Sequence, residues 1–101
     1  MSNEVKIPEE GMFNIPENGM IYMSAEWCSP CKMVKPFIKQ FQEDGENVIK
    51  VDVDESPLMA EYFQVNSIPS FIAIKNGKEV DRVLGAQPKK VLQELLDKTR
   101  D

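Results

Sequence analysis

The two cysteines of the chain, Cys28 and Cys31, lie in the segment AEWCSPCKM and are separated by Ser29 and Pro30. Two thiols at this spacing can form a reversible disulfide, supply part of a metal site, or close a short structural loop. The thiolate is the form of cysteine that attacks disulfides and binds metals. The choice among these chemistries depends on the rest of the chain and on the elements that carry the pair.

The alternatives to redox chemistry have weak support from the residues. A structural zinc site takes about four ligands, usually Cys or His. The chain has 2 cysteines and no histidine, so zinc would require carboxylates or a second subunit. A purely structural disulfide would close a very short loop, which removes little entropy from the unfolded chain. Both alternatives stay open from the residues alone, and a redox-active pair is the one that they favour.

Length and charge indicate the class of protein. With 101 residues and an apolar share of 42%, the chain predicts a single domain, residues 1–101, with one modest core. Its net charge of −5 argues against a nucleic-acid surface, which needs a basic face, and favours a monomer through self-repulsion. No apolar run reaches the roughly 18 residues of a membrane span, and the first residues lack the apolar core of a signal peptide. We therefore expect a cytoplasmic protein without membrane contact, and in a reducing cytosol a CxxC pair is more often catalytic or metal-binding than structural.

The cysteines lie between a predicted strand and a predicted helix. Residues 19–25 form a short apolar run, which is typical of a buried strand. A helix follows from residue 29 or 30 to about residue 44, with Pro30 in its first turn and Gly45 at its end. Apolar side chains recur in it at spacings of three and four, and these are Val34, Phe37, Ile38 and Phe41. Cys28 would then lie at the helix N-terminus, where free backbone N–H groups stabilise a thiolate.

Three further strands are predicted by alternation and β-branched residues. They are expected over residues 47–54, 70–75 and 78–85. Asn76-Gly77 is a strong hairpin signal and joins the last two.

Two further helices complete the predicted pattern. One runs from residue 57 to about residue 64 with Ser56 as its N-cap, and the other covers residues 89–99. The polar start of the chain allows a short edge strand over residues 5–7 and a helical turn over residues 9–13. The order β-α-β-α-β-β-α implies a mixed sheet with helices on both faces.

The segment AEWCSPCKMVKP resembles the active-site segment of the thioredoxin family, whose usual form is WCGPCK followed by a proline within the helix. SIPSF is similar to the family's Ile-Pro-Thr segment, KNG follows at the family's distance, VLGA matches the glycine before the last helix, and KVDVDE matches the second strand with its lysine, Lys50. The resemblance covers about residues 19–99. It implies a thioredoxin-like α/β fold of three layers, α/β/α, with a central mixed sheet of four to five strands.

The resemblance implies a thiol–disulfide oxidoreductase that reduces protein disulfides. Cys28 would attack the target to form a mixed disulfide, and Cys31 would then release the reduced target. No bound cofactor or metal is expected, and an NADPH-dependent flavoprotein reductase would recharge the disulfide. The alternatives are a binding or accessory subunit on the same scaffold, and a more oxidising disulfide exchanger. A glutathione-coupled, glutaredoxin-like protein is disfavoured because the Cys-Pro-Tyr-Cys and Thr-Val-Pro segments of that group are missing.

The resemblance also assigns residues around the cysteines. Trp27 would be a partly exposed lid beside the thiols, with a core aromatic as the alternative because tryptophan is highly buried on average. Pro69 would be a cis-proline facing the cysteines, with an ordinary trans proline as the alternative. Ile68, Gly85 and Ala86 would form an apolar docking collar around the first cysteine, and the residue before the proline would offer its backbone to an extended substrate.

Two positions depart from the family pattern. Tyr22 replaces the family's buried aspartate, the supposed proton acceptor for the second cysteine, and a tyrosine with the reference pKa of about 10 cannot act as a base near neutral pH. We therefore expect Cys31 to deprotonate through water or groups linked to Lys50, with slower or more pH-dependent turnover. Ser29 replaces the glycine that usually precedes Pro30, and its hydroxyl can bond a sulfur or the helix N-terminus. We expect a reduction potential different from that of an ordinary thioredoxin.

Overall fold

The computed structural model describes residues 15–100. The elements follow one another as β1 (Gly19–Ser24), α1 (Ser29–Glu43), β2 (Val48–Asp52), α2 (Pro57–Tyr62), β3 (Ser70–Lys75), β4 (Lys78–Leu84) and α3 (Lys89–Asp97). The predicted order of strands and helices is therefore confirmed. The strand and the helical turn predicted over residues 5–7 and 9–13 lie outside the described residues.

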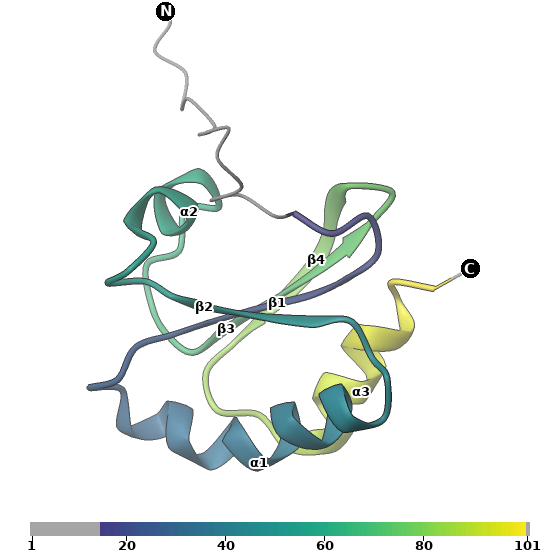
Figure 1. Ribbon diagram of the computed structural model, residues 1–101, viewed down its shortest axis with the longest axis horizontal. Helices are drawn as coiled ribbons and strands as arrows, with labels where there is room; N and C mark the ends of the chain where they lie inside the picture. Colours follow the sequence, from purple (N-terminus) through teal and green to yellow (C-terminus); the bar gives the residue numbers. More distant parts are fainter. Residues whose placement is uncertain (1–14, 101) are drawn as a thin grey trace, which may run out of the picture.

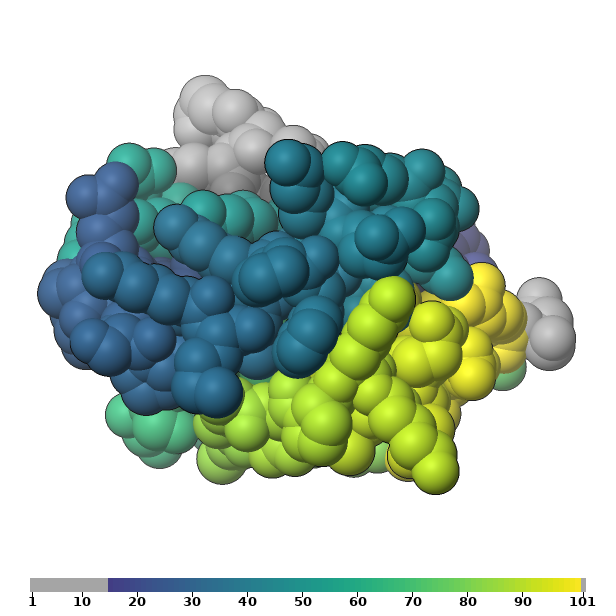
Figure 2. All heavy atoms as spheres, turned by 90° about the horizontal axis from the view of Figure 1, so that it is seen from below, coloured from purple at the N-terminus to yellow at the C-terminus, as the bar shows by residue number. Residues whose placement is uncertain are grey.

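The four strands of the described part form one mixed sheet in the order β2-β1-β3-β4. β1 pairs in parallel with β2 and antiparallel with β3, and β3 pairs antiparallel with β4. Figure 1 shows α2 on one face of the sheet and α1 and α3 on the other, and Figure 2 shows α1 and α3 side by side. The prediction of three layers around a mixed sheet is confirmed. Within residues 15–100, none of the helices has the length and apolar character that a membrane span requires.

The side chains of β1 alternate between the two halves of the core. Met20 and Tyr22 pack with the buried residues of α1 and α3, whereas Ile21 and Met23 pack with α2 through Met59. All six residues of β1 are buried, because helices cover both faces of the sheet at this strand. The unbroken apolar sequence of β1 follows from this double burial.

Turns with positive φ set several element boundaries. Asn76 and Gly77 have φ angles of 57° and 77°, as the predicted two-residue hairpin turn requires.

α1 ends just before Gly45, as predicted. Ser56 is the N-cap of α2, as predicted, but its side chain makes no capping hydrogen bond. α2 ends at Tyr62, two residues before its predicted end at about residue 64. The other predicted ends also agree to within two residues.

Candidate active site

The chain directions bring several connections to one end of the sheet. Because β1 and β2 are parallel, the cysteine loop and the turn after β2 leave the sheet at the same end. Met23 pairs with Ser70, and Ser70 pairs with Leu84, so β3 begins and β4 ends there as well. The segments Ile68–Pro69 and Gly85–Ala86 therefore lie at the same end as the cysteines. Every segment that the sequence predicted to surround the cysteines is brought to this end.

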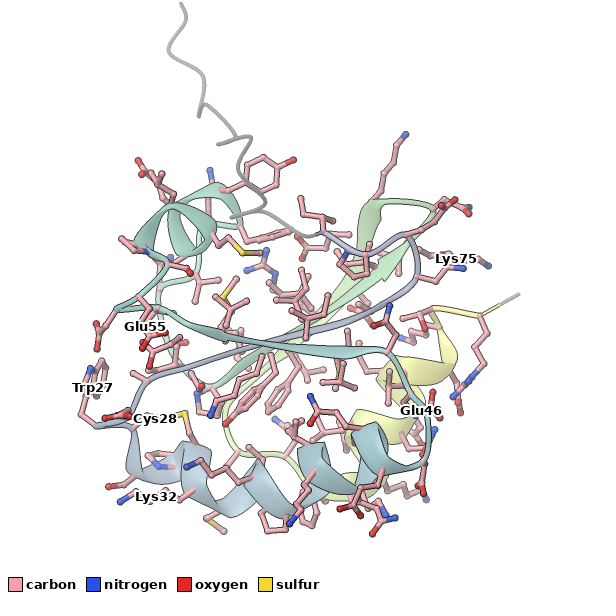
Figure 3. All side chains as sticks on the ribbon, viewed as in Figure 1. Trp27, Cys28, Lys32, Glu46, Glu55 and Lys75 are labelled. Carbon is pink, nitrogen blue, oxygen red and sulfur yellow. A yellow bond between two sulfur atoms is a disulfide. The ribbon has the colours of Figure 1, made fainter. Side chains whose placement is uncertain are left out.

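Cys28 and Cys31 form a disulfide, with Cα atoms 5.3 Å apart. Figure 3 shows Cys28 at the start of α1, at the same end of the molecule as Trp27 and Glu55. Cys28 is the N-cap of this helix, and its Sγ accepts a hydrogen bond from the backbone N–H of Cys31 at 3.2 Å. A donor of the helix N-terminus thus points at this sulfur, and the same interaction stabilises a thiolate after reduction.

Trp27 lies at the surface beside the disulfide. It is 67% exposed, so the alternative of a core aromatic is wrong. Its indole Nε1 donates a hydrogen bond to Oδ2 of Asp54 at 2.7 Å. Asp54 could not be identified from the sequence, because a surface aspartate after a strand carries no signal for a contact 27 residues away.

The segment before β3 contains a cis peptide bond between Ile68 and Pro69. Pro69 is fully buried, and its carbonyl accepts a hydrogen bond from the backbone N–H of Gly85 at 2.8 Å, where φ is 86°. Ile68 packs against the core cluster that contains both cysteines, and Ala86 is exposed. Within residues 15–100, the backbone N–H and C=O of Ile68 make no hydrogen bond. These groups are free to pair with another chain.

Tyr22 lies fully buried behind the disulfide. Its ring stacks on Phe71, with centroids 5.2 Å apart and an interplanar angle of 8°. Its hydroxyl donates to the backbone C=O of Cys31 at 3.2 Å. Burial raises the pKa of Tyr22 above its ordinary value of 10.0, and a hydrogen bond from Ser24 opposes this only in part. Tyr22 is therefore a neutral hydrogen-bond donor near neutral pH.

A pocket of about 280 Å³ opens beside Tyr22, between α1 and the β1–β2 edge of the sheet, and both cysteines line it. Ser24 lines it as well and is only 3% exposed. Its charged side chains are Glu26, Lys32, Lys35, Lys50, Asp52 and Glu55. Lys50 thus lines the same pocket as the cysteines, and its link to the deprotonation of Cys31 stays a prediction, whereas Asp52 and Glu55 were not predicted. Among the described residues, no group of three or more His, Cys, Asp or Glu side chains could hold a metal ion.

Ser29 and Pro30 occupy the exposed first turn of α1. In the described part of the chain, the Ser29 hydroxyl makes no hydrogen bond to another residue. The expected bond from this hydroxyl to a sulfur is therefore not formed in the disulfide state. Its effect on the reduction potential stays a prediction.

Comparison with known proteins gives consistent matches. The family model for thioredoxin matches residues 13–98. The thioredoxin of Staphylococcus aureus is 40% identical over 99 residues, which cover 93% of this chain and 95% of that protein. The reduced thioredoxin pre-protein of Schistosoma mansoni has a TM-score of 0.77 at 32% identity, with 86% of this chain and 83% of that chain covered. A thioredoxin from Nicotiana alata has a TM-score of 0.75 at 36% identity, with 87% and 77% covered.

These matches extend over the strands and helices that carry the disulfide, and they agree with the geometry of the CxxC pair. The chain belongs to the thioredoxin family, and it is a thiol–disulfide oxidoreductase with protein-disulfide reductase activity.

Proposed function

We propose that Cys28 is the nucleophile of this reductase and that Cys31 is its resolving thiol. The observation that carries this assignment is the hydrogen bond from the Cys31 backbone N–H to Cys28 Sγ at the N-terminus of α1. A thiolate at Cys28 would be stabilised by this hydrogen bond and by the positive end of the helix dipole. Cys31 lies one turn inside the helix, farther from that end. Exposure does not decide between the two, because they are 3% and 2% exposed in the disulfide.

The exchange proceeds in two steps. The Cys28 thiolate attacks one sulfur of the target disulfide, and the other target sulfur leaves as a thiolate. Cys31 then attacks Cys28 Sγ, and the bond between Cys28 and the target breaks. The two electrons of the protein's dithiol pass to the target, and the Cys28–Cys31 disulfide is restored.

The target docks beside Trp27 on a collar formed by Ile68, Gly85 and Ala86. Support comes from the unpaired backbone groups of Ile68 within the described residues, because an extended target segment can pair with them as an added strand. The exposure of Trp27 supports a role in contacting the target. The next residue, Pro69, is anchored by the hydrogen bond from the Gly85 N–H to its carbonyl, which supports a fixed position for this segment.

We also propose a wider setting, which family membership supports in part. The protein acts as a monomeric single domain, residues 1–101, in the cytoplasm, and disulfide-containing proteins are its targets. An NADPH-dependent flavoprotein reductase recharges it, and it needs no bound cofactor.

A trapping experiment tests the assignment of the two cysteines. The Cys31→Ser variant should accumulate a mixed disulfide with a disulfide-containing protein, and mass spectrometry should locate it at Cys28. The matched Cys28→Ser variant should form no such adduct at a comparable rate. Equal trapping at Cys31 in the Cys28→Ser variant would overturn the assignment. A cellular role that survives replacement of both cysteines would instead indicate a scaffold function.

A further inference from the structure

The second step of the exchange requires a proton acceptor, and this requirement rests on the function proposed above. When the mixed disulfide forms, Cys31 is a free thiol, and only its thiolate can attack. A thiol with the reference pKa of about 8.5 is mostly protonated near neutral pH. A nearby group that takes the proton would therefore speed the release of the target.

The buried residue next to Cys31 cannot supply this acceptor. Tyr22 uses its hydroxyl as a donor to the Cys31 carbonyl, and it stays neutral near neutral pH. This hydroxyl connects β1 to the backbone of Cys31, so Tyr22 is a positioning residue.

The pocket beside Tyr22 offers a route for the proton. It contacts both cysteines, and its volume of about 280 Å³ has room for several waters at roughly 30 Å³ each. The titratable groups that face it come from every surrounding element. They are Tyr22 from β1, Lys32 and Lys35 from α1, Lys50 and Asp52 from β2, and Glu26 and Glu55 from the loops. The lysines are donors only when charged, so the acceptor is one of the three carboxylates.

Asp52 is the carboxylate that the structure holds in place. It is half-buried, whereas Glu26 and Glu55 are exposed. It pairs in parallel register with Ser24, so its side chain lies on the Tyr22 face of the sheet. Its Oδ1 accepts hydrogen bonds from two backbone N–H groups, those of Asp54 at 2.8 Å and Glu55 at 3.3 Å. Within residues 15–100, its Oδ2 accepts none and is available to water.

We propose that Asp52 accepts the proton of Cys31 through water in this pocket, while Tyr22 holds the Cys31 backbone. The S–H bond of Cys31 breaks, and the proton passes through water to the Asp52 carboxylate. The Cys31 thiolate attacks Cys28 Sγ, and the bond between Cys28 and the target sulfur breaks. The electron pair of that bond leaves with the target thiolate. Asp52 then returns the proton to solvent through the open pocket.

Stopped-flow kinetics of Asp52→Asn test this role. The reduced protein is mixed with excess of an aromatic disulfide whose thiolate is coloured. The first release of colour then reports attack by Cys28, and the second reports attack by Cys31. Asparagine keeps a side-chain oxygen for the N–H groups of Asp54 and Glu55, so the turn after β2 is retained. Glu55→Gln is the matched control, because it removes the same charge from the same pocket.

The expected result is a change in the pH profile of the second phase alone. Between about pH 6 and about pH 7, Asp52→Asn should slow it by at least about tenfold. The difference in second-phase rate between Asp52→Asn and the unsubstituted protein should shrink toward about pH 9, where hydroxide deprotonates the thiol directly. The first phase, and both phases of Glu55→Gln, should stay within about twofold of the unsubstituted protein. Added formate should partly restore the second phase of Asp52→Asn at constant pH.

Two results would overturn the role of Asp52. One is a second phase in Asp52→Asn that follows the unsubstituted protein across the pH range. The other is an equal loss in Glu55→Gln, which would reflect charge alone. If Asp52→Asn does not fold, as judged by circular dichroism, Asp52→Ser is measured against the same criteria. A failure of the unsubstituted protein to show a second phase would contradict the proposed function instead.

Discussion

Replacing Tyr22 with phenylalanine isolates the contribution of one buried hydroxyl. The Tyr22→Phe variant keeps the ring that stacks on Phe71. It loses the hydrogen bond to the Cys31 carbonyl. A hydrogen bond of this kind contributes about 1 kcal/mol net, so the free energy of unfolding should fall by about that amount at neutral pH.

The difference in the free energy of unfolding between Tyr22→Phe and the unsubstituted protein should depend on pH. The folded state raises the pKa of Tyr22 above 10.0, so the unfolded state loses the tyrosine proton first as the pH rises. Above the unfolded pKa the unfolded state binds fewer protons, and stability falls by up to about 1.4 kcal/mol per pH unit. Above the unfolded pKa, this ionisation therefore reduces the free energy by which tyrosine stabilises the fold relative to phenylalanine. The advantage is fully present below pH 10.0 and is lost as the pH rises toward the folded pKa.

Urea unfolding of the disulfide forms of both proteins measures this difference. It should be about 1 kcal/mol in favour of tyrosine at neutral pH, and clearly smaller at about pH 11. Every other ionisable group is common to both proteins, so its contribution cancels in the comparison. A difference that is the same at both pH values would refute the argument from burial. Equal stability at neutral pH would refute the contribution of the hydrogen bond.

Three other substitutions test separate features. In Gly19→Ala the new Cβ would lie 2.6 Å from the backbone oxygen of Asn47, so urea unfolding should show a loss of more than about 1 kcal/mol. Because Trp27 is 67% exposed, Trp27→Ala should change stability by less than about 0.5 kcal/mol. It should raise KM for a protein disulfide but not for a small aromatic disulfide, and equal effects on both would contradict docking. Lys98 lowers the pKa of Asp81 below its ordinary 3.8, so this pair stabilises the fold above that pH and loses its effect as the pH falls through the folded pKa. Since both side chains are largely exposed, Lys98→Met should cost less than about 0.5 kcal/mol at neutral pH, and a loss unchanged at about pH 2 would contradict the assignment.

The fold was predictable because its main signals are local. The apolar repeat of α1, the Asn76-Gly77 turn and the alternation of β2 each depend on residues close together in sequence. Local signals fix the type and order of elements, and the rule for parallel crossovers then fixes how β1 and β2 pair. The ends of α2 and α3 were less predictable, because hydrogen bonds of the last turn decide where a helix ends.

The pocket beside the disulfide was only partly predictable. Tyr22 was identified as a departure from the family pattern and Lys50 as a match to it. Their pairing in adjacent strands, however, depends on strand register. Asp52 gave no signal, because its importance comes from lying opposite Ser24 and from the two N–H groups that bind its Oδ1. Ser24 and Asp52 are 28 positions apart in sequence, so their pairing depends on the three-dimensional fold and cannot be inferred from spacing alone.

The reduction potential of the Cys28–Cys31 pair tests most directly whether this protein works as a reductant. The protein is equilibrated in defined thiol buffers, and the fraction of disulfide is measured after acid quenching. We expect a value closer to about −270 mV than to about −180 mV, so that target disulfides are reduced. A value near about −180 mV or above would contradict it and would make the protein an oxidant or an isomerase.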